Sequence, residues 1–165
     1  MPQSNAFKFA NNILTNGGYD AADLVGAAGG ANTPAFWAYQ STTHSVSNTN
    51  HTKILFQTEV LDSDNNFASS RFTPTTAGYY LLTIGLRCDS GACEHFLQIY
   101  KNGSNYISLR DDEFTSYQLN GSAIVDANGS TDYFEVYFWQ NSGTTRTTNA
   151  GKTHTYFSGF KLIGV

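Results

Sequence analysis

The chain has 165 residues, which suits one domain, with 40% hydrophobic residues and a formal net charge of -4. Its nine lysines and arginines are scattered and no apolar run is long enough to cross a bilayer, so neither a nucleic-acid partner nor membrane insertion is expected. Only 13% of the residues are charged, about half the usual share. Polarity comes instead from serine, threonine and asparagine, which favour turns and strands. The composition therefore predicts an all-β protein.

The N-terminal segment, 1–33, differs in composition from the rest of the chain. Asn16-Gly-Gly18 and the segment Gly26–Ala31 are rich in glycine, and such sequence buries little surface while losing much chain entropy on folding. Residues 1–33 are therefore predicted to be an N-terminal arm, which is either a disordered tail or a segment that orders by docking on a larger particle. The start of the chain shows no basic segment followed by an apolar one, so no signal peptide is expected and synthesis in the cytoplasm is predicted.

From Pro34 onward, short runs of β-type residues alternate with turn residues, and no amphipathic helix of three turns is recognisable. This pattern predicts an antiparallel sandwich or barrel. Turns are expected at Asp62–Asn66, Pro74, Asn102-Gly103, Asn120-Gly121, Asn128-Gly129 and Ser142-Gly143. The expected strands are Ala35–Gln40, Thr52–Phe56, Gly78–Arg87, His95–Lys101, Ile107–Leu109, Gln118–Val125, Tyr133–Gln140 and Thr153–Ile163.

Two of these strands predict an outer surface that is unusually apolar. Alternation along Tyr133–Gln140 directs one set of side chains to the core and leaves Tyr137 and Trp139 on the outer face. The last strand carries Tyr156 and Phe160 in the same way. An apolar surface of this size is unfavourable in water unless another chain covers it, so we expect an oligomer. The predicted interface residues are Tyr39, Tyr137, Trp139, Tyr156 and Phe160.

Cys88 and Cys93 flank a four-residue segment. A disulfide between them would require Cα atoms within about 7 Å of each other, whereas reduced thiols are the usual state in a cytosol. The sequence leaves both states open. A zinc site is not expected, because no second pair of cysteines or histidines has matching spacing.

Two acidic segments are the only candidates for calcium. Asp62 and Asp64 begin a series of side-chain oxygens like the start of a calcium loop, but the glycine and the distal glutamate of such a loop are missing. Asp111 and Asp112 lie in a second acidic segment, which is expected to be a solvated loop. Aspartates also cluster in ordinary turns. The prediction is therefore no cofactor, with calcium at these aspartates as the alternative.

No catalytic site is recognisable in the sequence. The four histidines lie on separate expected elements, and neither a Gly-x-Ser-x-Gly elbow nor a His-Glu-x-x-His helix occurs. Cys93 and His95 would resemble a nucleophile and its base, but no third group to orient them is evident. We therefore predict a protein that is not an enzyme.

Several motifs occur in the order of a known family. They are Arg71-Phe-Thr-Pro74, Ala77-Gly-Tyr-Tyr80, Gln98-Ile-Tyr-Lys-Asn-Gly103 and Phe157-Ser-Gly-Phe160. With this order, residues 34–165 resemble the complement-q globular-head and tumour-necrosis-factor-like jelly rolls. The resemblance implies an antiparallel ten-stranded jelly-roll sandwich that forms a homotrimer. The chain departs from the family in the lengthened segment Asn128–Asp132.

The arm itself, Asn5–Asn12 followed by Gly17–Asp20, is similar to the leader of small structural proteins of marine bacteriophages. This resemblance implies a structural virion protein, namely a trimeric decoration or appendage on the capsid surface. It would assemble in the host cytoplasm and use its arm to bind other virion proteins, such as the major capsid protein. The alternative is a tail-fibre tip that binds a host receptor or glycan. Its contact surface would lie in the polar loops Ser41–Asn50, Asp111–Ser116 and Ser142–Gly151.

Overall fold

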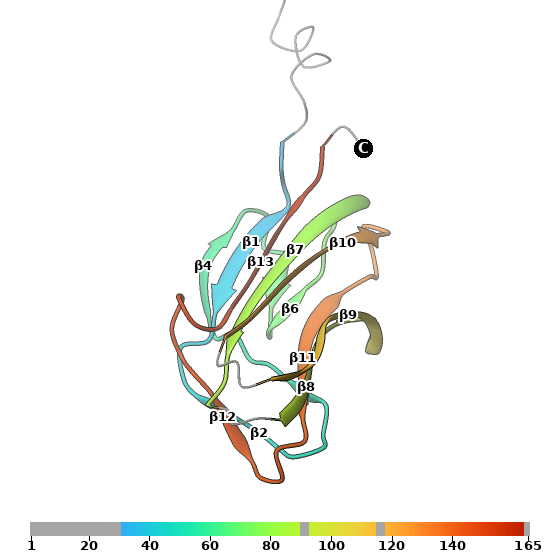
Figure 1. Ribbon diagram of the computed structural model, residues 1–165. Helices are drawn as coiled ribbons and strands as arrows, with labels where there is room; N and C mark the ends of the chain where they lie inside the picture. Colours follow the sequence, from blue (N-terminus) through green and yellow to red (C-terminus); the bar gives the residue numbers. More distant parts are fainter. Residues whose placement is uncertain (1–30, 90–92, 115–117, 164–165) are drawn as a thin grey trace, which may run out of the picture. The chain divides into compact units, whose positions relative to one another are not determined.

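Thirteen strands and no helix make up the part of the chain that the structure, a computed structural model, describes: residues 31–89, 93–114 and 118–163 (Figure 1). Most of the predicted arm lies outside these residues. No described segment forms a helix long and apolar enough to span a membrane.

The strands form an antiparallel jelly-roll sandwich, as predicted, but the described residues contain thirteen strands where ten were expected. One sheet has five strands, and in Figure 1 its strands β1, β13 and β7 run side by side. The other sheet has six, and a short two-stranded ribbon is separate from both. The five-stranded sheet has the order β10 (Gln118–Ala127), β7 (Gly78–Arg87), β13 (Tyr156–Lys161), β1 (Ala35–Tyr39) and β4 (Thr58–Asp62). The six-stranded sheet has the order β5 (Phe67–Ala68), β6 (Arg71–Phe72), β11 (Phe134–Gln140), β8 (Cys93–Lys101) and β9 (Ser104–Phe114), with β3 (Thr52–Lys53) beside β11. The ribbon pairs β2 (His44–Val46) with β12 (Arg146–Thr148).

An aromatic core holds the two main sheets together. Phe36 of the five-stranded sheet stacks on Phe67 and Phe72 of the other sheet, with ring centroids 5.0 and 4.3 Å apart. Phe36 also meets Phe157 of its own sheet edge-on at 4.8 Å. All four rings are buried. Such pairs add stabilisation beyond the area they bury, so these rings help to hold the two sheets together.

Of two Asn-Gly pairs that were expected to form turns, one forms a turn and the other lies inside a strand. Asn102 and Gly103 both have positive φ, 55° and 80°, and join β8 to β9 as predicted. The turn predicted at Asn120-Gly121 is wrong, because this pair lies inside β10. A Cβ atom at Gly121 would lie 2.7 Å from the Cβ atom of Leu109. The glycine therefore permits close packing of β9 on β10 and does not reverse the chain.

The predicted polar loops are partly strands. Ser41–Asn50 contains β2 and Ser142–Gly151 contains β12, and the two strands pair with each other. Thr148 fixes this ribbon from inside, because its buried hydroxyl donates to Gln40 Oε1 at 2.9 Å. The acidic segment predicted as a third loop begins within β9, since residues 111–114 pair with β8.

Gly129 provides a test of the turn before β11. It has φ 71°, and a Cβ atom there would meet the backbone of Thr76 and Ala77, with the Thr76 carbonyl carbon at 2.7 Å. We expect Gly129→Ala to destabilise the protein by about 2–4 kcal/mol, from the strained φ and the backbone clash together. Gly143 is the matched control, because it has φ 82° and a Cβ atom there would have no other atom within 4 Å. Gly143→Ala should lower the free energy of unfolding by about 1–2 kcal/mol, from the strained φ alone. Urea denaturation measures both losses. Equal losses for the two variants would contradict this account.

Candidate functional site

The outer face of the five-stranded sheet carries large apolar side chains that lie in solvent. The exposed fractions are 50% for Leu61, 50% for Tyr79, 59% for Ile124 and 36% for Phe160. Single exposed apolar residues are common on protein surfaces, but a contiguous group of them marks an interaction site.

The strand register places Leu61, Ile124 and Phe160 in two neighbouring rows, and Tyr79 lies two residues from Leu81 on the same face of β7. Ile124, Leu81, Phe160 and Ala35 occupy neighbouring positions across four strands. The next row is also free of charge and runs through Ser122, Thr83, Ser158, Trp37 and Leu61. We call this surface the apolar face, defined by Trp37, Leu61, Tyr79, Leu81, Ile124, Tyr156 and Phe160.

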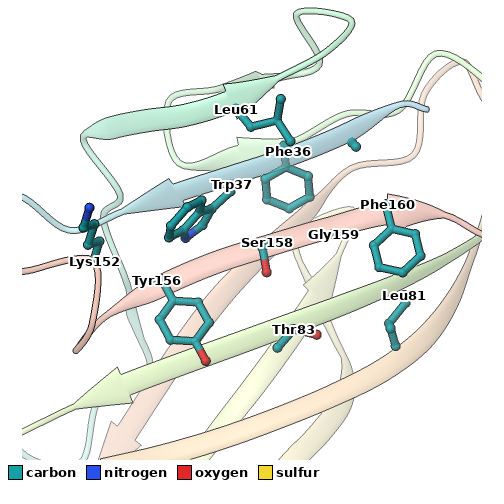
Figure 2. A pocket seen from close by; sticks show the side chains of 11 residues that line it. Phe36, Trp37, Leu61, Leu81, Thr83, Lys152, Tyr156, Ser158, Gly159 and Phe160 are labelled. Carbon is teal, nitrogen blue, oxygen red and sulfur yellow. The ribbon is translucent and has the colours of Figure 1, made fainter. Parts of the chain in front are cut away.

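A groove of about 370 Å³ crosses the apolar face (Figure 2). Trp37 and Leu61 line one side of it, and Leu81 and Phe160 line the other. Lys152 is the only charged residue among those that line it in the described part of the chain. The groove therefore suits an apolar group from another chain.

The Tyr156 ring packs over the neighbouring strand β7, because β7 has a glycine at the position opposite Tyr156. Gly85 is the Cα partner of Tyr156, and a Cβ atom at Gly85 would overlap the tyrosine ring. On the other side, Tyr39 is the Cα partner of Tyr156. The register thus places both tyrosines on the outer face of the five-stranded sheet, and Tyr156 lines the groove.

The five predicted interface residues do not share one surface. Tyr156 and Phe160 lie on the apolar face, and Tyr39 lies beside Tyr156 on the outer face of the same sheet. Tyr137 and Trp139 lie on the outer face of the six-stranded sheet, where Tyr137 stacks on Tyr100 and Trp139 stacks on Phe96. The five residues thus lie on the outer faces of two sheets, because β11 and β13 belong to different sheets. Their place in an interface stays a prediction.

The predicted interface residues did not include five members of the apolar face: Trp37, Leu61, Tyr79, Leu81 and Ile124. Alternation within Gly78–Arg87 would have placed Tyr79 outside, since Tyr80 is fully buried. Leu61 gave no such signal, because no strand was expected at Thr58–Asp62.

On the outer face of the six-stranded sheet, Glu135 is a buried charge with two cationic partners. Its Oε1 lies 2.7 Å from Lys53 Nζ and 2.9 Å from an Arg71 guanidinium nitrogen. Burial alone would raise the pKa of this carboxyl, but hydrogen bonds and charges from Lys53 and Arg71 outweigh it and hold the pKa below its usual 4.5. Arg71 also lies over the Tyr133 ring at 3.9 Å. The cluster anchors β3 and β6 to β11.

Glu135→Gln is expected to lower the free energy of unfolding by about 1.5–3 kcal/mol, because it removes charge-assisted hydrogen bonds. The Arg71 side chain is 42% exposed, so water screens its share and the loss should fall near the lower value. The folded-state pKa of Glu135 lies below the unfolded one, so the ion pairs stabilise the fold above pH 4.5 and lose this effect as the pH falls. The difference between wild type and variant in urea denaturation should therefore shrink in acid. Glu59→Gln, at an exposed position, is the control; a difference independent of pH would contradict the assignment.

Asp62 and Asp64, two of the candidate calcium ligands, accept hydrogen bonds within a turn. The Asp62 carboxylate accepts hydrogen bonds from the backbone amides of Asn66 and Phe67 at 3.0 and 2.9 Å, and Asp64 accepts one from the Ser63 hydroxyl. These contacts hold the turn between β4 and β5. The side chains of Asp111 and Asp112 lie outside the described residues. Within the described residues, no three His, Cys, Asp or Glu side chains are grouped as a metal site.

Cys88 and Cys93 are both buried free thiols, so the disulfide that the sequence left open is not formed in this structure. Burial, with the nearby Asp89 carboxylate, raises the pKa of Cys88 to about 12, and burial raises the pKa of Cys93. His95 is also buried, with its Nδ1 3.1 Å from the Cys93 carbonyl oxygen. A thiol with a raised pKa is a poor nucleophile at neutral pH, so this pair offers little for catalysis.

Comparison with known proteins supports the fold. The family model of the C1q domain matches residues 35–162. None of the curated proteins matches the chain.

Three solved structures illustrate the similarity of fold. The globular domain of zebrafish complement 1qA protein has 18% identity and a TM-score of 0.53, with 78% of this chain and 96% of that chain covered. Murine APRIL has 13% identity and a TM-score of 0.58, with 78% and 98% covered. PRD1 vertex protein P5 has 15% identity and a TM-score of 0.59, with 81% and 99% covered.

Proposed function

The chain belongs to the C1q domain family, and from this premise we propose that it is a structural protein of a bacteriophage virion. In this proposal it forms a homotrimer that decorates the capsid surface or an appendage, after assembly in the host cytoplasm. It acts without catalysis and without a cofactor. The similarity of fold to PRD1 vertex protein P5, whose name places it at a vertex, supports a position on a particle.

The observation that carries this proposal is the apolar face. Four of its side chains are 36–59% exposed in the single chain, and the groove beside Trp37 is open to an apolar group. A second copy of this chain is the occupant we propose, because the trimer implied by the family resemblance would remove such a surface from water. Covering contiguous apolar area is the main favourable contribution to association.

The position on a particle has a direct test. Purified virions of the bacteriophage that encodes this chain should contain the protein in a fixed ratio to the major capsid protein, measured by quantitative mass spectrometry. Labelling with a specific antibody should then locate it on the particle surface by electron microscopy. Its absence from purified particles would exclude the virion role while leaving the trimer untouched.

Deletion of residues 1–33 is expected to leave a folded trimer that no longer attaches to particles. The reason is that every strand found in the described residues begins at Ala35 or later, whereas the arm is proposed to bind other virion proteins. Binding of the purified full-length and truncated proteins to particles that lack this protein would be compared by co-sedimentation. Unchanged attachment of the truncated trimer would refute the role of the arm.

A second function, recognition of a host receptor or glycan by a fibre tip, is favoured by a different observation. The outer face of the six-stranded sheet carries aromatic rings that the apolar face does not include.

A further inference from the structure

Two buried thiols lie at the ends of the connection between the two main sheets. Cys88 directly follows β7 of the five-stranded sheet, and Cys93 is the first residue of β8 in the six-stranded sheet. Their exposed fractions are 2% and 6%. Neither thiol belongs to the apolar face. A bond between them would close a short loop at the place where the chain passes from one sheet to the other.

One short segment, from Asn141 to Thr148, contacts the chain beside both cysteines. Cys88 pairs with Thr148 in an antiparallel bridge. The backbone amide of Glu94, which follows Cys93, donates to Asn141 Oδ1 at 2.9 Å, and the Asn141 amide donates to the Glu94 carbonyl oxygen at 3.2 Å. The two cysteines are therefore held against the same part of the structure, and they are only five residues apart in the chain.

The Arg146 guanidinium acts on both thiols. Its Nε donates to Ser142 Oγ at 2.8 Å and its Nη1 to the Asp89 carbonyl oxygen at 3.3 Å. Burial raises the pKa of both thiols, and the positive charge of Arg146 opposes this rise at each of them. The charge of Cys93 also raises the pKa of Cys88, which agrees with two sulfur atoms that lie near each other. A nearby guanidinium favours the thiolate, which is the reactive form of cysteine.

We propose that Cys88 and Cys93 form a reversible disulfide when the protein passes from a reducing to an oxidising medium. In a cytosol the two thiols remain reduced, as they are in this structure. In an oxidising medium, a disulfide would close the loop from β7 to β8 and restrict the unfolded chain, which stabilises the folded protein. The capacity to form this bond does not depend on the virion role. Only the passage from cytosol to medium rests on the proposed function.

The oxidant in this step is a small-molecule disulfide, and the reaction consists of two successive thiol–disulfide exchanges. Cys93, the less buried thiol, loses its proton and attacks one sulfur of the oxidant, whose S–S bond breaks and releases one thiolate. Cys88 then loses its proton and attacks the sulfur of Cys93 in the mixed disulfide, which releases the second thiolate. The two released thiolates take up the two protons. The protein thus loses two electrons, and the small disulfide is reduced to two thiols.

Oxidised glutathione provides a direct test on the full-length protein. After incubation at mildly alkaline pH, both free thiols should disappear, the mass should fall by about 2 Da, and a peptide map should link Cys88 to Cys93. The oxidised protein should unfold at a higher urea concentration than the reduced protein. Because burial slows the exchange, the protein is also refolded from urea in the presence of oxidised glutathione. Two free thiols, or two glutathione adducts, in the refolded protein would overturn the proposal.

Single substitutions test the order of the exchanges and the role of Arg146. Cys88→Ser should accumulate the mixed disulfide of Cys93 with one glutathione, and Cys93→Ser should react more slowly. Arg146→Gln should slow the oxidation of the native protein by about threefold or more, because it removes the charge that favours both thiolates. Arg87→Gln is the matched control, since Arg87 is exposed and contributes to neither pKa shift. Oxidation of Arg146→Gln at the wild-type rate would contradict the role of the guanidinium.

Purified virions distinguish this inference from the proposed function. Alkylation of free thiols at the time of lysis should label both cysteines in protein from host cells and neither cysteine in protein from virions purified in air. Two labelled thiols in the virion protein would overturn the switch. Absence of the protein from virions would instead refute the proposed function and leave the disulfide of the purified protein unaffected.

Discussion

Replacing Phe160 with aspartate is expected to convert the assembled protein into folded monomers of 18.0 kDa. Phe160 lies in the centre of an uncharged row on the apolar face, between Leu81 and Ala35, and is 36% exposed in the single chain. An aspartate there can reach water in a monomer but would be buried without a partner in a trimer. An uncompensated buried charge costs roughly 3–5 kcal/mol, which weakens association at least about a hundredfold.

Sedimentation velocity would measure this change, and circular dichroism would verify that the variant keeps its β structure. Leu55→Asp is the matched control, because Leu55 has a similar exposed fraction, 38%, and lies outside the strands of the apolar face. The control should sediment as the wild type does. If Phe160→Asp kept the mass of the wild-type assembly, the apolar face would not be the interface.

The second large effect is expected in the core. Phe36→Ala should lower the free energy of unfolding by about 3–5 kcal/mol, since it leaves a cavity and removes three aromatic contacts. Phe36 contacts rings of both sheets, Phe67 and Phe72 in the six-stranded sheet and Phe157 in its own sheet. The neighbouring strands cannot collapse into the space without losing their pairing.

Urea denaturation at one fixed protein concentration would measure the loss, because the stability of an oligomer depends on concentration. Leu55→Ala, at an exposed position, should change the stability by less than about 0.5 kcal/mol. A loss below about 1 kcal/mol for Phe36→Ala would mean that the aromatic cluster does not hold the sheets together.

Local pattern predicted the central strands well. The strand Gly78–Arg87 has the predicted bounds, because Tyr80, Leu82, Ile84 and Leu86 alternate with residues of the outer face and are fully buried. The edge strand Thr58–Asp62 was missed for the opposite reason. Its residues are largely exposed and do not alternate, so only pairing with β1 makes them a strand.

Tertiary packing decided what local pattern could not. Asn120-Gly121 has the composition of a turn, yet the approach of Leu109 requires a glycine inside β10. The same limit applies to the candidate site. Alternation shows that Tyr137 and Phe160 point out of the sandwich, but only the sheet order places them on different faces. Strand order depends on long-range pairing, which a single sequence does not reveal.

Light scattering of the wild-type chain in dilute buffer tests the central claim most directly. If copies of the chain cover the apolar face, the measured mass should be three times 18.0 kDa and should stay there on dilution through the micromolar range. A soluble species of 18.0 kDa under these conditions would contradict the account, because Leu61, Tyr79, Ile124 and Phe160 would then remain in water without a partner.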